Sequence, residues 1–188
     1  MKFKTVNVAL GLGFLIGLAC TLGGLWIWAK PIVAQSMLEK SWTQTLKHNA
    51  PQRPWPRLDA HPIAKLKLAR LNQSEIILNR SSGQALAFAP ALIEGTTPLG
   101  EPGLSIISAH KNTHFSFLKH IKNGDIVELD MVDKTTLKYR ITHGEIIHSD
   151  KASFPQLENS TLALMTCYPF DTVSFGGPLR YVVYAQKV

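Results

Sequence analysis

One cysteine is the natural starting point for any chemistry in this chain. Of the two cysteines, Cys20 lies inside an apolar N-terminal run and Cys167 lies near the C-terminus. If that run is in a membrane, the two cannot form a disulfide, and an exported domain then carries one unpaired thiol. Cys167 follows an apolar strand-like segment and precedes Tyr168 and Pro169, which end that strand. A thiol at a strand end can open into a cleft and act as a nucleophile.

Two other residues can assist such a nucleophile. Arg180 begins the segment RYVVYA (180–185), and if the last two strands pair, its guanidinium lies close to the sulfur. An arginine there can stabilise an oxyanion, although position alone equally allows an exposed charge at a strand end. His110 directly follows the segment LSIISA (104–109) and starts a polar loop, but the chain has seven histidines and position alone makes His110 a weak candidate for proton transfer.

Several other kinds of site are disfavoured by the residues present. His114 stands four residues after His110, but the preceding sequence is strand-like and no third ligand is evident, so we expect no metal site. Ser108 lacks a Gly-x-Ser-x-Gly turn, and no carboxylate pair stands out for glycoside hydrolysis. The formal net charge is +7 without a dense basic stripe interleaved with aromatics, so we expect no nucleic-acid partner.

The N-terminal segment predicts a membrane anchor. Val8–Ala29 holds 22 residues without a charge, which is long enough to cross a bilayer as a helix. Lys2 and Lys4 precede it, and Trp26 lies where interfacial aromatics gather. A cleaved signal peptide is the alternative, but the run is long for one. We therefore expect a retained single-pass anchor in the cytoplasmic (inner) membrane, with the rest of the chain on the extracytoplasmic or periplasmic side.

A short helix and a proline-rich spacer follow the anchor. Apolar residues at 33, 37, 38, 42 and 46 predict one face of a helix, and three prolines within 51–56 predict an extended stretch. The expected organisation has three parts: an anchor over 1–30, a juxtamembrane helix and spacer over 31–58, and a catalytic domain over 59–188.

The residue pattern of the catalytic domain predicts mostly strands. Residues 63–68 and 125–131 alternate apolar and polar side chains, as half-buried strands do. Further strands are expected at 75–78, 104–109, 135–148 (kinked at Gly144), 161–166 and 180–185, with short helices at 84–92 and 115–121. Seven or eight short strands with few helices predict a mostly β fold, a closed β-barrel preceded by a transmembrane helix.

Three segments resemble the His, Cys and Arg motifs of sortases, and they occur in the order of that family. They are AHKNTHFSFL (109–118), LMTCYPFD (164–171) and PLRYVV (178–183). The sequence is most similar to the sortase class of Gram-negative proteobacteria, which it also resembles at residues 54–56 (Pro-Trp-Pro) and in its anchor. The resemblance covers about residues 54–188.

The resemblance implies a role for each matching residue. Cys167 matches the nucleophile, His110 the general acid and base, and Arg180 the oxyanion-stabilising arginine. Thr166 matches the threonine that precedes the cysteine in the family, and we expect it and Tyr168 to contact substrate.

Three positions depart from the family pattern without touching these groups. Ala163 stands where a threonine is usual, Ala109 where many members have glycine, and Lys111 where this class often has arginine.

The implied function is that of a membrane-anchored cysteine transpeptidase. It would cleave a C-terminal sorting signal of an exported protein through a Cys thioester and transfer the acyl group to an amine acceptor, without a cofactor. Two alternatives stay open. One is another exported cysteine acyltransferase such as an L,D-transpeptidase, although its arginine usually lies closer to the cysteine. The other is a non-enzymatic membrane-tethered β-domain.

Overall fold

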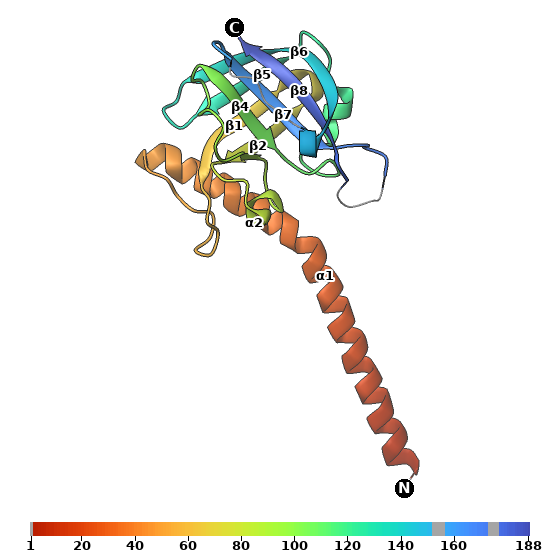
Figure 1. Cartoon of the computed structure of the whole chain (residues 1–188). Coiled ribbons are helices and arrows are strands. Elements are labelled where there is room, and N and C mark those ends of the chain that lie inside the picture. Colours follow the sequence, from red (N-terminus) through yellow and green to blue (C-terminus); the bar gives the residue numbers. More distant parts are fainter. Residues whose placement is uncertain (1, 152–156, 173–176) are drawn as a thin grey trace. The chain divides into compact units, whose positions relative to one another are not determined.

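The computed structural model describes residues 2–151, 157–172 and 177–188 (Figure 1). The chain divides into two compact units, Met1–Met37 and Leu38–Val188, and each is described by itself. The elements in chain order are α1 (Lys2–His48), β1 (Pro62–Leu68), η1 (Ala69–Leu71), β2 (Gln73–Leu78), α2 (Gly83–Leu86), β3 (Ala91–Leu92), β4 (Gly103–Ser108), η2 (Ser116–His120), β5 (Ile126–Met131), β6 (Thr136–His148), η3 (Ser149–Lys151), β7 (Ser160–Cys167) and β8 (Leu179–Lys187).

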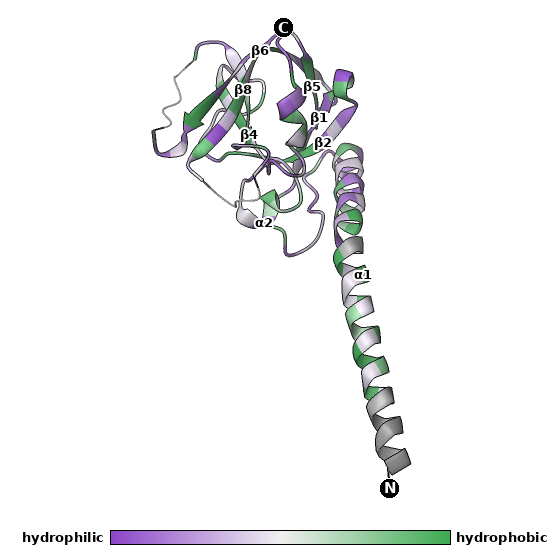
Figure 2. Ribbon diagram, turned by 90° about the vertical axis from the view of Figure 1, so that its right-hand side faces the viewer, coloured by the Kyte–Doolittle hydropathy of each residue, from purple (hydrophilic) through white to green (hydrophobic). Residues whose placement is uncertain are grey.

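Helix α1 joins the expected anchor and the expected juxtamembrane helix into one continuous helix with Pro31 inside it. A proline within a helix removes one backbone hydrogen bond, and here long helical stretches flank it on both sides. Every side chain from Gly11 to Ile27 is exposed, and polar residues gather in the C-terminal part of α1 (Figure 2). Among the described residues, this helix is long and apolar enough to cross a membrane, by length and composition alone.

The second unit is built around a closed eight-stranded barrel, which confirms the predicted mostly β barrel. The strand order around the barrel is β1-β2-β3-β4-β7-β8-β6-β5. Two of its strand pairs are parallel, β2 with β3 and β4 with β7, and the other pairs given by the register are antiparallel. Because β4 and β7 run in the same direction, their C-terminal ends lie at the same edge of the barrel.

Side-chain alternation along the strands separates an interior cluster from an outer one. On β7, Leu162 and Leu164 belong to the buried interior cluster, whereas Ala163 belongs to a second cluster on the outer face. The buried members of this outer cluster are Leu104, Ile106, Ala163 and Val182, with Ile93, Ile147, Leu157, Met165 and Tyr184 partly buried against them. A third cluster joins the C-terminal part of α1 to the barrel through Leu38, Trp42, Leu58 and Ile76 among others.

The observed strands follow the predicted ones closely, with two local differences. Residues 84–92 were expected to form one helix, but they form the end of the short α2 and the two-residue strand β3, with residues between them. The irregularity in β6 lies between Ile141 and His143, not at Gly144. Gly144 has a different requirement, because a Cβ there would lie 2.5 Å from the Tyr181 hydroxyl oxygen.

Candidate active site

The C-terminal ends of β4 and β7 bring His110 and Cys167 to the same level of the barrel. The parallel register pairs Ser108 with Met165, and the next amide on this path, that of Ala109, donates to the Met165 carbonyl at 3.2 Å. His110 is two residues after Ser108, just as Cys167 is two residues after Met165. The two residues therefore leave their strands side by side.

Arg180 lies on the other side of Cys167. In the antiparallel pair of β7 and β8, Cys167 is the register partner of Arg180. Paired residues in neighbouring strands present their side chains to the same face of a sheet. Both side chains are half-buried, so neither is sealed in the core and neither is fully in solvent. The described cysteines are both free thiols.

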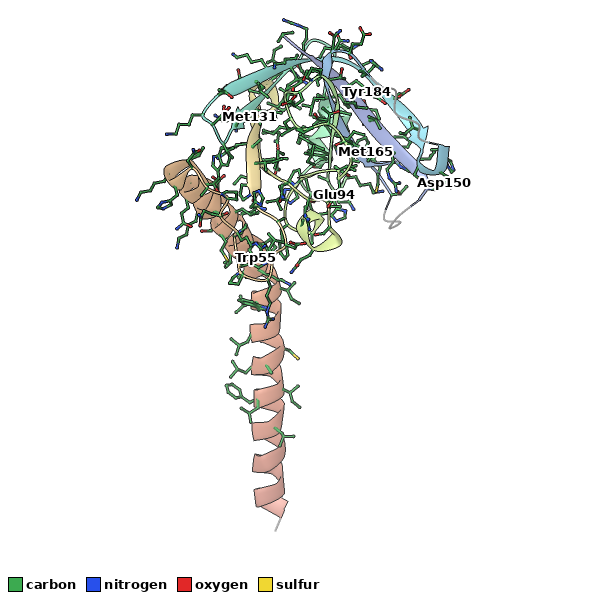
Figure 3. All side chains as sticks on the ribbon, turned by 60° about the vertical axis from the view of Figure 1, so that its left-hand side comes forward. Trp55, Glu94, Met131, Asp150, Met165 and Tyr184 are labelled. Carbon is green, nitrogen blue, oxygen red and sulfur yellow. The ribbon has the colours of Figure 1, made fainter. Side chains whose placement is uncertain are left out.

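The face that these residues share is the outer face of the barrel. Successive outward positions on β7 and β8 are Met165 and Val182, which belong to the outer apolar cluster, and Figure 3 labels Met165 and Tyr184 on these two strands. His110 continues the alternation of Ile106 and Ser108 on β4. The candidate site thus consists of a histidine, a thiol and a guanidinium at the end of an apolar strip.

Backbone carbonyls of its own segment hold the Arg180 guanidinium. Its Nη1 donates to the carbonyl of Gly177 at 2.6 Å and to that of Leu179 at 2.9 Å. These two bonds orient the planar group relative to β8. A guanidinium fixed in this way is pre-organised to donate its remaining hydrogens to an oxygen at the site.

Thr166 points away from the shared face. The residue is only 1% exposed, and its hydroxyl donates to the Ala109 carbonyl at 2.7 Å. This bond ties the residue before Cys167 to the residue before His110. The structure therefore gives Thr166 a contact that sets the spacing of the two strand ends.

Tyr168 lies half-buried at the start of the β7–β8 loop. Its amide donates to the Leu179 carbonyl at 3.0 Å, which extends the strand pairing by one step beyond Cys167. Its ring meets Phe170 edge to face with centroids 6.1 Å apart, and Phe170 in turn meets Tyr181 at 5.5 Å. The loop after the cysteine is thus anchored to the barrel by aromatic contacts.

Sequence reasoning missed Lys111 as a structural part of the site. The lysine is buried, and its ammonium donates to the carbonyls of Pro169 and Thr172 at 2.6 and 2.9 Å and to the Thr172 hydroxyl at 2.8 Å. Its position next to His110 was the only signal in the sequence. A polar loop after a strand gives no reason to expect a buried cation.

His114, the residue that raised the question of zinc, has a carboxylate partner. Its Nδ1 lies 2.8 Å from Glu75 Oε2, and both side chains are largely buried. This contact connects the loop after His110 to β2. Among the residues that the structure describes, no group of three or more His, Cys, Asp or Glu side chains is arranged to hold a metal ion.

A separate cavity of about 350 Å³ lies near the start of β7, at the far end of that strand from Cys167. His143 stacks on Tyr184 in its lining, with ring centroids 4.9 Å apart. Burial, and then the neighbouring carboxylate of Glu145, raises the pKa of Tyr184 to about 12. This cavity does not include the three candidate catalytic residues.

Comparison with known proteins points to one family. A family profile described as Sortase domain matches residues 66–188. A search of curated protein sequences returned no match.

Solved structures give the same fold. A sortase D5 transpeptidase from Clostridium perfringens aligns with a TM-score of 0.66 and 19% identity, over 83% of this chain and 98% of its own. A lid mutant of sortase A from Corynebacterium diphtheriae aligns at 0.62 and 20%, over 84% and 95%. C. perfringens sortase C with the C-terminal cell wall sorting motif aligns at 0.59 and 20%, over 85% and 89%. At these identities the likeness shows a shared fold.

Proposed function

Because this chain belongs to the sortase family, we propose that it is a membrane-anchored cysteine transpeptidase whose reactive groups are Cys167, His110 and Arg180. The observation that carries this proposal is the register of three strands. Cys167 pairs with Arg180 across β7 and β8, and the parallel pairing of β4 with β7 brings His110 alongside. Acyl transfer requires a nucleophile, a proton carrier and an oxyanion donor, and these three groups lie at the ends of neighbouring strands.

The first half of the reaction forms an acyl-enzyme. The Cys167 thiolate attacks a backbone carbonyl carbon of the substrate, and the carbonyl oxygen becomes an oxyanion that the Arg180 guanidinium stabilises. Collapse of this intermediate breaks the peptide C–N bond, and His110 donates a proton to the leaving amine. The products are a thioester on Cys167 and a released C-terminal fragment.

The second half transfers the acyl group. An incoming amine attacks the thioester carbonyl, His110 takes the proton from that amine, and the bond to sulfur breaks to regenerate the thiolate. The new product is an amide, and no oxidant, reductant or cofactor enters this balance. His110 therefore alternates between acid and base.

The substrate we propose is an exported protein with a C-terminal sorting signal, in keeping with the sortase C that was solved with such a motif. The exposed apolar part of α1 supports a location in the cytoplasmic membrane with the barrel outside. Enzyme and substrate held at one membrane surface meet at a raised effective concentration. The three motifs and Pro54-Trp55-Pro56 favour assignment to the proteobacterial class of the family.

The two alternatives are less well supported. The barrel and the family match favour a sortase over an L,D-transpeptidase. A β-domain that only binds partners would not require a half-buried thiol paired across the sheet with an arginine.

The test is to trap the acyl-enzyme. The purified full-length chain in detergent is incubated with exported proteins from the same source, and the Cys167 peptide is analysed by mass spectrometry. We expect a peptidyl thioester on Cys167 and none in Cys167→Ala, with an unchanged melting temperature for the variant. A folded Cys167→Ala protein that still cleaves substrate would contradict the proposal. The trapped peptide also reports the part of the sorting signal that precedes the cleaved bond.

A further inference from the structure

Lys111 is a buried lysine beside the candidate active site. The residue is 8% exposed, although lysine is one of the residues least often found inside proteins. An ammonium has three protons to donate, and three acceptors surround this one: the carbonyl oxygens of Pro169 and Thr172 and the Thr172 hydroxyl, all within 2.9 Å. The hydrogen-bonding capacity of the group is fully used.

These bonds connect the segments that carry the two reactive side chains. Lys111 is the residue after His110, and Pro169 is two residues after Cys167. Two further hydrogen bonds join the strand ends themselves: the Thr166 hydroxyl donates to the Ala109 carbonyl, and the Ala109 amide donates to the Met165 carbonyl. Lys111 therefore forms a second connection between the two segments, beyond the ends of β4 and β7.

The chemical type of the acceptors indicates the role of the hydrogen bonds that Lys111 donates. The ion pairs formed by the described residues do not include Lys111, and two of its acceptors are backbone carbonyls. Backbone acceptors fix the path of the main chain, so the ammonium holds the loop that leaves Cys167 against the loop that leaves His110. Burying an ammonium is costly unless its hydrogen bonds are made, which makes this arrangement specific.

We propose that Lys111 is a positioning residue of the transpeptidase site: its ammonium clamps the main chain at Pro169 and Thr172 and so sets the separation of His110 and Cys167. The part of this proposal that concerns catalysis rests on the proposed function. The clamp acts through the two loops and does not require contact with substrate. A displacement of a reacting group by about 1 Å can cost up to roughly 10²-fold in rate.

The experiment compares Lys111→Met, Lys111→Arg and Lys119→Met in the full-length chain in detergent micelles. Methionine keeps an unbranched apolar stem and removes all three donors, whereas arginine keeps a charged donor in a different geometry. Lys119 lies in η2, which follows the same loop, but it is exposed, and it receives the same substitution as a matched control. Turnover is measured with a fluorogenic peptide that spans the cleavage site of the substrate protein identified from the adduct on Cys167. Hydrogen exchange is measured over residues 168–172.

We expect Lys111→Met to lower kcat by roughly 10- to 100-fold with KM changed little, because catalytic groups are displaced while the substrate surface remains. Exchange over 168–172 should rise, Lys111→Arg should recover part of kcat, and Lys119→Met should match wild type. Wild-type kcat per folded Lys111→Met molecule would overturn the proposal, as would a loss confined to KM.

Hydrogen exchange tests the clamp formed by Lys111 independently of the transpeptidase reaction. If the wild-type chain shows no turnover, the proposed function fails, and the exchange over 168–172 still tests the clamp. Faster exchange in Lys111→Met, but not in Lys119→Met, supports the clamp. Unchanged exchange overturns it.

Discussion

At the scale of single residues, Arg180 is the group whose structural and chemical roles are hardest to separate. Its Nη1 bonds to two carbonyls of its own segment, which is what a residue that only stabilises a strand end would do. Its register partner is the candidate nucleophile, which is what an oxyanion donor requires. The two roles predict different results for a lysine at this position.

We expect Arg180→Lys to fold normally and to lose most of its turnover. Lysine keeps the charge but lacks the planar fork of donors. Removing an oxyanion donor typically lowers the rate roughly 10²–10³-fold. The measurement is peptide cleavage alongside a thermal melt, with alkylation of Cys167 by a small reagent as a check that the thiol stays accessible. Near-wild-type turnover would leave Arg180 as a structural residue and reduce the site to Cys167 and His110.

Residue positions together with the resemblance to the sortase motifs identified the candidate reactive groups, but not the residues that hold them. Cys167 and Arg180 could be paired from the sequence because each lies at the end of a strand-like segment. The burial of Lys111 and the inward direction of Thr166 depend on which loops meet across the barrel. Such contacts join residues 57 and more positions apart, and no local pattern encodes them.

At the scale of elements, the strands with regular alternation were predicted well. β1 and β5 each bury alternate side chains, which is the pattern that their sequences show. β3 was missed because its two residues form a strand only through their partners on β2 and β4. A kink in β6 was expected at Gly144, whereas the register shifts between Ile141 and His143. Gly144 instead allows the close approach of Tyr181, a residue from another strand.

The turn that leads into β5 is held by an ion pair. The Arg70 guanidinium on η1 donates to both carboxylate oxygens of Asp125 at 2.5 and 2.6 Å, and to the His120 carbonyl at 2.7 Å. The Asp125 side chain is 6% exposed. Hydrogen bonds from Arg70 hold the pKa of Asp125 below its ordinary value of 3.8. Because the unfolded chain binds this proton more readily, the pair stabilises the fold above pH 3.8 and loses this contribution as the pH falls through the lowered value.

We therefore expect Asp125→Asn to lower the stability of the barrel at pH 7 by about 1.5–3 kcal/mol, the usual range for hydrogen bonds to a charged group. The deficit should shrink as the pH falls below 3.8, because the Asp125 carboxylate of the unfolded chain is then protonated while that of the native chain stays ionised until its lower pKa. Thermal melts at pH 7 and near pH 3 give the measurement. Asp59→Asn is the matched control, because Asp59 pairs with Arg80 in an exposed position where an ion pair contributes little. An equal deficit at both pH values would contradict the assignment.

At the scale of the whole molecule, the chain combines an apolar helix with a barrel, and the candidate site lies at one end of neighbouring barrel strands. From Gly11 to Ile27 every side chain of α1 is exposed, and these residues carry no charge. An exposed apolar surface of this length is unfavourable in water and favourable in a bilayer core about 30 Å thick. Seventeen residues of helix at 1.5 Å each span about 26 Å, and the uncharged run extends further in both directions.

We expect residues 1–29 to remain attached in the mature protein and to hold it in the cytoplasmic membrane with the barrel outside. The 22 residues without a charge at 8–29 favour retention, because this run is long for a cleaved signal peptide. N-terminal sequencing of the mature protein from the membrane fraction should read from the start of the chain, and protease added outside spheroplasts should digest the barrel. As a control for insertion, Leu15→Arg and Leu22→Arg together should shift the protein out of the membrane fraction, since a charge at the bilayer centre costs about 2.5–3.5 kcal/mol on insertion scales. A soluble mature protein that begins near residue 30 would count decisively against a retained anchor.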